Sequence, residues 1–355
     1  MINSLPRVIL FSMILLIIVF FIYVYPVAVL SHLLVGSAIF SAPSYGVTLV
    51  LACLIFYYLR SHSTSVILSS LTHYGMGVGF IAFGVVNLGL LGKTLSGADA
   101  FMIGALCLVA ALGLSVKAIY NGRALHMRNL SFNSPKISTP LRLIFISDVH
   151  LGSNPKFHLD RICQKINQLD YDALLIGGDL FDSSAFQLAD LSAFKQLTKP
   201  IYYITGNHEY YVKNHQTKIE ALRDYNLMIL DDEAALFKGI NIIGIDDYHT
   251  PKEQADIAQK LISPDLYNLV LVHQPALWGA LPSEADLMLS GHTHNGQLMP
   301  FNWLVRLQFK AVYGLYKQGT NQAYVSSGAG TWGPRMRLGT QNEIIHITLS
   351  PSADK

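Results

Sequence analysis

The sequence predicts an all-α transmembrane region followed by an α/β domain, and three observations support this fold class. Hydrophobic residues make up 51% of the 355-residue chain and charged residues only 14%, whereas a soluble domain carries about a quarter charged residues. The deficit lies in residues 1–121, which hold 4 of the 25 basic and 1 of the 23 acidic residues. After residue 140, short apolar runs alternate with helix-like stretches. We therefore predict a transmembrane anchor over 1–121, a linker over 122–140 and an α/β domain over 141–350.

The N-terminal region contains four apolar runs long enough to cross a bilayer, which takes roughly 20 residues. The runs cover residues 8–30, 38–59, 75–91 and 100–120. The first run is longer than the apolar part of a signal peptide, and three more runs follow it. Lysine and arginine lie mainly on one side of the spans, which places the N-terminus and the α/β domain in the cytoplasm. The sequence thus predicts a multi-pass protein of the inner or plasma membrane.

The predicted spans carry almost none of the ionisable side chains that are typical of transport pathways. His32 and His73 lie at or near span ends, and Asp99 lies in a loop. An anchor or scaffold is therefore favoured over a transporter. Gly75 and Gly79 form a pair of small residues four positions apart, which favours close helix packing.

The region after residue 121 is close to neutral, with 21 basic and 22 acidic residues. Domains that bind nucleic acid normally show a basic face, so we expect no nucleic-acid partner. The three cysteines, Cys53, Cys107 and Cys163, lack the spacing of disulfide frameworks or zinc sites. We predict that they are buried free thiols, which fits a reducing compartment.

The strands of the α/β domain are predicted from short runs rich in Val, Ile, Leu or Tyr, which are typical of buried strands. These runs cover residues 141–147, 173–176, 201–204, 240–245, 269–272, 287–289, 323–326 and 344–349. Apolar residues at helical spacing predict helices over 159–169, 189–197 and 219–225. Strands alternate with helices in the first part of this region, and strands follow one another in the last part. This order predicts an α/β domain whose sheets lie in the middle, between helices.

Polar clusters follow five of the predicted strands, at 147–150, 177–182, 206–209, 273–275 and 291–294. In open α/β folds, ligands bind at such strand ends. The Asp-x-His and His-x-His pairs place both side chains on one side, because side chains alternate along a strand. Carboxylate, amide and imidazole groups without cysteine suit divalent Mn, Fe or Zn ions. The candidate metal ligands are Asp148, His150, Asp179, Asn207, His273, His292 and His294.

Taken in order, these five motifs resemble those of the calcineurin-like metallophosphoesterase superfamily, over roughly residues 140 to 350. The stretches 291–297 and 328–338 resemble the branch that carries N-terminal membrane spans. The resemblance implies a four-layer αββα sandwich as the catalytic domain. It also implies hydrolysis of a phosphomonoester, phosphodiester or pyrophosphate bond by two divalent metal ions, which share a water and lower its pKa.

The resemblance further implies a role for each residue. Asp148, His150 and His294 would hold the first metal ion. Asn207, His273 and His292 would hold the second, and Asp179 would bridge the two ions. His208 matches the general acid that protonates the leaving group. Asp182 would fix the tautomer of His208, or would only cap a turn.

Several positions leave alternatives open. Some relatives place an arginine after the second motif to hold phosphate, but here Ser183 and Ser184 follow Asp182. Arg335 and Arg337 either supply this contact or are surface arginines. The aromatic and basic stretch 301–316 either lies in the membrane interface and guides a lipid substrate to the metals, or packs in the core.

The expected partner is a phosphoester substrate, with a membrane lipid as one option because the anchor confines the enzyme to the bilayer surface. The alternatives are a phosphodiesterase for soluble nucleotides and a catalytically inactive metal-binding scaffold. The presence of His208 disfavours the scaffold, since a scaffold needs metal ligands but no general acid.

Overall fold

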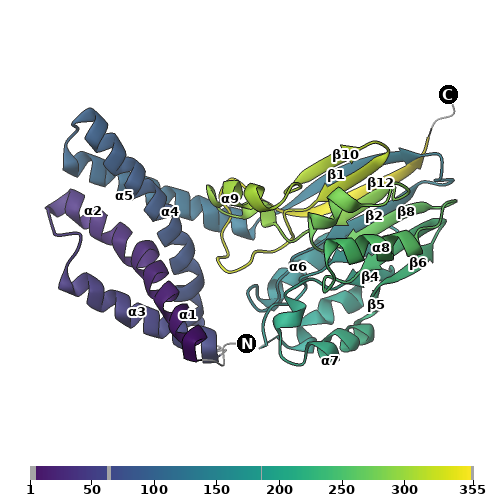
Figure 1. The fold of residues 1–355 in the computed structure, drawn as a ribbon, viewed down its shortest axis with the longest axis horizontal. Helices are drawn as coiled ribbons and strands as arrows, with labels where there is room; N and C mark the ends of the chain where they lie inside the picture. The colour runs from purple at the N-terminus through teal and green to yellow at the C-terminus, as the bar shows by residue number, and fades with distance from the viewer. Residues whose placement is uncertain (1–4, 62–64, 185, 353–355) are drawn as a thin grey trace. The chain divides into compact units, whose positions relative to one another are not determined.

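The computed structural model describes residues 5–61, 65–184 and 186–352 (Figure 1). The chain forms two compact units. One comprises the residues up to Tyr120 together with Gly333–Met336, and the other comprises Asn121–Trp332 and the residues from Arg337 onward. The first unit is helical and the second contains all the strands of both sheets.

Among its described residues, the helical unit contains four helices whose length and composition suffice to cross a membrane. The first runs over Pro6–Val35 and consists of α1 (Leu5–Val19), the π-helical turn η1 (Phe20–Val24) and α2 (Tyr25–Val35). The others are α3 (Ala42–Ser61), α4 (Val66–Ser96) and α5 (Ala100–Arg123). Each predicted apolar run coincides with one of these helices. Helix α4 extends beyond its predicted run at both ends. It starts earlier because Ser65 accepts a hydrogen bond from the Leu68 N–H and caps it, and it ends at Gly97, which has a left-handed backbone.

The predicted close packing at the glycine pair of α4 is confirmed. A Cβ atom on Gly75 would lie 2.6 Å from Cε1 of Tyr23, and one on Gly79 would lie 2.0 Å from the backbone oxygen of Ile22. The Tyr23 hydroxyl donates a hydrogen bond of 2.7 Å to the Thr72 carbonyl. Glycine at both positions therefore lets α4 lie directly against η1.

We expect Gly79→Leu to lower the stability of the helical unit by about 2 kcal/mol, because its side chain would meet backbone that cannot move aside. Thermal unfolding of the purified protein in detergent measures this loss. Gly84→Leu is the matched control, since it lies in the same helix and a Cβ there meets no atom within 4 Å. Equal melting temperatures for the two variants would contradict the packing argument.

The α/β unit contains two six-stranded sheets. The first has the order β1 (Leu125–Ser134), β12 (Asn342–Pro351), β2 (Leu141–Ile146), β3 (Ala173–Gly177), β4 (Ile201–Ile204) and β5 (Leu227–Ile229). Strands β2 to β5 are parallel, β12 is antiparallel to β2, and β1 is parallel to β12.

The second sheet has the order β10 (Gly314–Gln318), β11 (Asn321–Val325), β9 (Leu287–Ser290), β8 (Tyr267–Val272), β7 (Ile240–Ile245) and β6 (Glu233–Phe237). Its four central strands are parallel and its two edge strands are antiparallel. In both sheets the central strands are buried on both faces, as continuous apolar runs predict.

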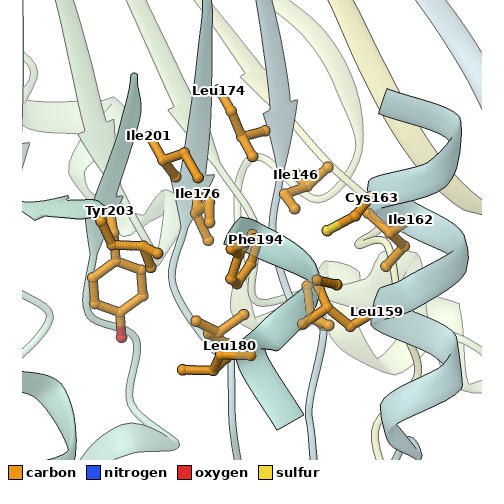
Figure 2. Close-up of a cluster of buried hydrophobic side chains, with 14 of the residues drawn as sticks. Ile146, Leu159, Ile162, Cys163, Leu174, Ile176, Leu180, Phe194, Ile201 and Tyr203 are labelled. Carbon is orange, nitrogen blue, oxygen red and sulfur yellow. The ribbon is translucent and has the colours of Figure 1, made fainter. Parts of the chain in front are cut away.

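Three hydrophobic clusters divide the unit into layers. Alternate residues of β2 belong to different clusters: Leu143 and Phe145 pack with Leu269 and Leu271 of β8 between the sheets, as the period-two alternation of a strand requires. Ile144 and Ile146 pack on the other face against α6 (Lys156–Ile166) and the 3₁₀ helix η2 (Leu188–Gln196). Figure 2 shows residues of this second cluster, with Leu159 and Ile162 of α6 near Ile146.

The third cluster covers the outer face of the second sheet. Ile243 and Val270 pack against Ala258 of α8 (Pro251–Leu261) and Leu277 of the 3₁₀ helix η5 (Pro275–Ala280). The unit is therefore a helix–sheet–sheet–helix sandwich, which confirms the predicted four-layer fold.

The structure differs from the sequence prediction where strands are short, polar or at an edge. Strand β1 occupies most of the stretch 122–140, which was expected to be a linker with at most a short strand over 130–132, and it pairs along its whole length with β12. The full strand is hard to recognise in the sequence because it lies at a sheet edge with half of its residues exposed, so it lacks an apolar run. The other strands and α-helices that the sequence did not predict are β5, β6, β10, α8 and α9 (Phe301–Gln308).

Candidate metal centre

The predicted ligands lie where the parallel strands of the two sheets end. Asp148 and His150 follow β2, Asp179 follows β3, and Asn207 follows β4. From the second sheet, His273 follows β8, and His292 and His294 follow β9. The carboxyl ends of parallel strands meet at one edge of a sheet, so each sheet presents its share of the set at one edge.

The first group comprises Asp148, His150 and His294, whose ligand atoms all lie within 4.8 Å of one another. The Nε2 atoms of His150 and His294 are 3.0 Å apart, and His294 Nε2 lies 3.6 Å from Asp148 Oδ1. All three side chains are buried. Neighbouring ligands of a cation held at roughly 2.1 Å are about 3 Å apart in octahedral geometry, so this spacing fits one divalent ion.

The second group comprises Asp179, His273 and His292, which also offer ligand atoms within 4.8 Å of one another. His273 Nε2 lies 3.3 Å from His292 Nδ1, and Asn207 Oδ1 lies 2.9 Å from the same His292 atom. The amide of Asn207 therefore joins this group, and the four residues predicted for the second ion and the bridge lie together.

Asp179 lies between the two groups. Its Oδ2 atom is 3.1 Å from His273 Nε2 in the second group and 3.6 Å from His150 Nε2 in the first. Its Oδ1 atom accepts the backbone N–H of His208 at 2.9 Å. One carboxylate oxygen thus faces both groups while the other is held by the backbone.

Five of the seven candidate ligands have a left-handed backbone, which costs a non-glycine residue on the order of 1–3 kcal/mol. They are Asp148, His150, Asp179, His292 and His294, with φ values of 54°, 52°, 52°, 71° and 49°. Strain of this kind persists where the surroundings hold it, and it concentrates at functional sites. Here the N–H of Asp148 donates to Gly178 O at 3.0 Å and that of His292 to Asp148 Oδ1 at 2.9 Å.

Glycines allow the strand-end loops to approach the carboxylates. A Cβ atom on Gly206 would lie 2.3 Å from Asp179 Oδ1, and one on Gly291 would lie 2.3 Å from Asp148 Oδ2. Both distances are too short for any side chain, so the Gly-Asn-His and Gly-His-Thr-His motifs need glycine at their first position.

Polar contacts at Nδ1 orient His273 and His150. His273 Nδ1 donates to the carbonyl of Gly177 at 2.8 Å, which leaves Nε2 directed at Asp179. His150 Nδ1 lies 3.2 Å from Asp182 Oδ2, which leaves its Nε2 for the first group. Contacts of this type set the tautomer of a metal-binding histidine.

Asp182 makes contacts that the sequence prediction did not include. Asp182 was expected to orient His208, but its Oδ2 atom contacts His150, and its Oδ1 atom accepts the Ser153 N–H at 2.9 Å. The reason is topological: β2 and β3 are neighbours, so the loop after β3 that carries Asp182 lies on the loop after β2. Asp182 remains close to His208, since His150, Asp182 and His208 offer atoms within 4.8 Å of one another.

His208 lies beside the first group. Its ring centroid is 4.8 Å from that of His150, 5.4 Å from that of Tyr211 and 5.5 Å from that of Trp332. Burial lowers the pKa of His208 to about 4, although the Asp179 charge acts in the opposite direction. A phosphate dianion bound nearby would favour the protonated ring.

The pKa shifts of the candidate histidine ligands favour the binding of a cation. Burial alone would lower the pKa of His273, but the Asp179 carboxylate raises it well above its usual value. Burial lowers the pKa of His292 to about 3 and that of His294 well below its usual value. Two imidazoles are therefore unprotonated, and a proton held between His273 and Asp179 can be replaced by a metal ion. This donor set suits divalent Mn, Fe or Zn.

Glu209 is a structural residue of the site that the sequence analysis did not single out. It is fully buried, and its carboxylate accepts the N–H groups of Asp179, Phe181 and Gly206 at 2.8–3.1 Å. It therefore joins the loops after β3 and β4. Burial raises its pKa to about 7, and the Asp179 charge adds to this shift. The sequence signal that could have identified Glu209 is an acidic residue directly after the Asn207-His208 pair.

Arg337 is neither a surface arginine nor free to hold phosphate. It is 0% exposed, and its guanidinium donates to the carbonyls of His294 at 3.0 Å and Gly330 at 2.7 Å, and to the Ser327 carbonyl. Its Nε donates to Asn342 Oδ1. The prediction was wrong because an arginine in a Gly-rich loop normally faces solvent. Arg335 is half-buried.

The comparisons with known proteins agree with this geometry. Residues 141–296 match the family model for calcineurin-like phosphoesterases. A metallophosphoesterase of Helicobacter pylori is 37% identical over 68% of this chain and 69% of its own length. A Bos taurus transmembrane protein with a metallophosphoesterase domain is 33% identical over 61% of this chain and 54% of its own. A metallophosphoesterase of Campylobacter jejuni is 35% identical over 63% of each chain.

Proposed function

Because this chain belongs to the metallophosphoesterases of the calcineurin-like family, we propose that it hydrolyses a phosphomonoester, phosphodiester or pyrophosphate bond with two divalent metal ions. Its apolar helices anchor it to a membrane. The observation that carries the dinuclear proposal is the position of Asp179 Oδ2, 3.1 Å from His273 Nε2 and 3.6 Å from His150 Nε2. One oxygen within reach of both ligand groups is what a bridging carboxylate requires.

The two ligand groups support one ion each. Asp148, His150 and His294 would hold the first ion, Asn207, His273 and His292 the second, with Asp179 shared. When bound, divalent ions supply a water nucleophile at neutral pH and neutralise charge on the phosphoryl oxygens. Mn, Fe and Zn all suit these ligands.

The remaining side chains would position the ligands and move a proton. His208 would donate a proton to the leaving oxygen, because its ring adjoins the first group without belonging to it. Asp182 would hold His150, and the Gly177 carbonyl would hold His273, so that each presents Nε2 to the site.

The catalytic unit would face the cytoplasm from the inner or plasma membrane, since basic residues gather on the side of the spans that carries it. A membrane lipid is one candidate substrate and a soluble nucleotide is another. An inactive scaffold is the third alternative, and the placement of His208 beside the ligands favours an enzyme over it.

The test is to purify the full chain, measure its bound metals and assay soluble and lipid phosphoesters. We expect about two divalent ions per chain and hydrolysis of at least one ester. His208→Ala should lower kcat by about 10²–10⁴-fold with metal content unchanged, because general acid catalysis contributes that factor.

His215→Ala is the matched control for the His208 variant, since His215 lies on α7 (His215–Glu220), outside the ligand groups. A wild-type protein without metal that hydrolyses no ester in the panel would overturn the proposal. Full activity of the His208 variant on every ester would remove the proton-donor role alone.

A further inference from the structure

Helix α9 carries an apolar face that is open to solvent. None of its eight residues is buried, and Trp303, Leu304 and Leu307 are 62%, 58% and 84% exposed. Residues three and four apart lie on the same face of a helix, so these three side chains form one patch. Core packing, one of the two alternatives for 301–316, therefore applies to the buried Ala311 and Val312 but not to α9. An exposed apolar patch of this kind marks an interaction surface.

The helix lies against the candidate metal centre. A Cβ atom on Gly296, two residues after His294, would be 2.2 Å from Cα of Asn302 in the first turn of α9. Directly after the helix, the Phe309 ring lies 5.4 Å from the His292 ring. Both ends of α9 thus contact the loop that carries the two histidines.

The charge around α9 fits an anionic lipid surface. Residues 299–317 contain Arg306, Lys310 and Lys317 and no acidic residue. The side chains of Arg306 and Lys310 are exposed. A short amphipathic helix with tryptophan and leucine on one face and basic residues beside them is typical of helices that lie in a membrane interface.

The chain also links this region to the end of its last membrane-capable helix. Asn342 donates from Nδ2 to the carbonyl of Gly122, in the last turn of α5, at 2.8 Å, and accepts from Arg337. Arg337 in turn donates to the His294 carbonyl at 3.0 Å. Two side chains therefore connect the point where α5 ends to the loop before α9.

We propose that α9 inserts its apolar face into the interface of the bilayer that anchors the chain, and that the adjoining site takes a phospholipid-class ester from that leaflet. The substrate class rests on the proposed function, whereas the docking of α9 does not. The reaction is hydrolysis: the oxygen of water bonds to phosphorus, the bond from phosphorus to the leaving oxygen breaks, and that oxygen gains a proton.

The docking is tested without any enzymatic readout. The full chain, with Trp278 and Trp332 changed to Phe so that Trp303 is the only tryptophan, is reconstituted in phosphatidylcholine vesicles with a minor share of phosphatidylglycerol. Trp303 emission should be lower by about twofold or more in vesicles whose lipids carry brominated acyl chains than in plain vesicles. Bromine quenches a tryptophan only when the two are close, so quenching requires Trp303 to lie within the bilayer interface. In the control, Trp278, Trp303 and Trp332 are all changed to Phe and Leu236→Trp places the reporter on β6. The emission of this reporter should be the same in plain and brominated vesicles. Equal emission of Trp303 in plain and brominated vesicles overturns the docking.

The delivery of lipid is tested with Leu304→Ser/Leu307→Ser in the same vesicles. Fluorescent phosphatidic acid and phosphatidylglycerol are the lipid probes, and p-nitrophenyl phosphate and its bis ester are the soluble probes. We expect lipid hydrolysis to fall by about tenfold or more, with soluble-ester hydrolysis unchanged. Leu236→Ser/Phe157→Ser is the matched control, because these side chains are 70% and 59% exposed and belong to β6 and α6, and it should change neither rate.

The outcomes separate this inference from the proposed function. Loss of lipid and soluble hydrolysis by the same factor in the α9 variant overturns lipid delivery and leaves the phosphoesterase intact. Hydrolysis of soluble esters with no lipid hydrolysis by the wild type also overturns delivery, and points to the soluble-nucleotide alternative. Hydrolysis of none of the probes by a metal-loaded wild type counts against the proposed function, while the Trp303 quenching still decides the docking.

Discussion

Asp179→Asn is expected to abolish phosphoesterase activity, with kcat falling about a thousandfold or more. The variant keeps the shape of the side chain but removes the charge that faces both ligand groups, at 3.1 Å from His273 and 3.6 Å from His150. Metal ions supply several kcal/mol of transition-state stabilisation, and each 1.36 kcal/mol is about a tenfold change in rate. Metal content should also fall, from about two ions per chain to one or fewer.

The measurement combines metal analysis of the purified protein with kcat on whichever ester the wild type hydrolyses. Asp256→Asn is the matched control, because Asp256 is an exposed residue of α8 that belongs to neither ligand group. It should keep both metal content and rate. Two ions bound by the Asp179 variant at wild-type affinity would show that this carboxylate does not bridge them.

Without metal, the Asp179→Asn variant should show a weaker dependence of folding stability on pH than the wild type. Burial of the Asp179 carboxylate is offset by its attraction to His273, which holds the Asp179 pKa well below its usual range. Such a group stabilises the fold above its unfolded pKa, near 4, and this contribution is lost as pH falls through the lower folded pKa. The uncharged Asn has neither the burial cost of a charge nor the attraction to His273. After metal is removed with a chelator, the free energy of unfolding of the variant should therefore fall less at acid pH than that of the wild type.

The sequence predicted the ligand set because the signals for it are local. A buried strand followed directly by Asp, Asn or His can be recognised from a short apolar run and the residue after it. Parallel strands then bring those residues together at one edge of the sheet. This reasoning placed all seven candidate ligands at strand ends that the structure also has, among them Asp148 after β2 and His292 after β9. The four-layer arrangement came from the resemblance, since no periodicity states how two sheets stack.

What the sequence did not predict depends on contacts between distant segments. Asp182 contacts His150 rather than His208 because of how two neighbouring loops lie on each other. Strand β1 is recognisable only through its partner β12, some 200 residues later in the chain. Helix α9 was read as an undivided aromatic stretch, because eight residues hold only about two helical turns of pattern.

Arg337 is the largest departure from the sequence prediction, and its removal is the second large expected effect. Arg337→Ala should lower the free energy of unfolding of the α/β unit by about 3–5 kcal/mol, because it leaves several buried acceptors without donors. These acceptors are the carbonyls of His294, Ser327 and Gly330 and the side chain of Asn342. Arg223→Ala is the matched control, with a side chain that is 55% exposed and paired with the surface residue Glu220, and it should change stability by less than about 1 kcal/mol.

Arg337→Lys separates a need for charge from a need for geometry. A lysine would keep the positive charge but cannot donate in several fixed directions at once as a guanidinium does. The acceptors of Arg337 come from the His294 loop, from residues 327–330 and from the first residue of β12, so we expect the lysine variant to recover only a minor part of the lost stability. Thermal unfolding with and without added Mn²⁺ measures both effects. Stabilisation by Mn²⁺ should be smaller in the lysine variant than in the wild type, since the His294 loop would no longer be held for the first ion. Full recovery by lysine would mean that the buried charge alone matters, and that Arg337 does not position His294.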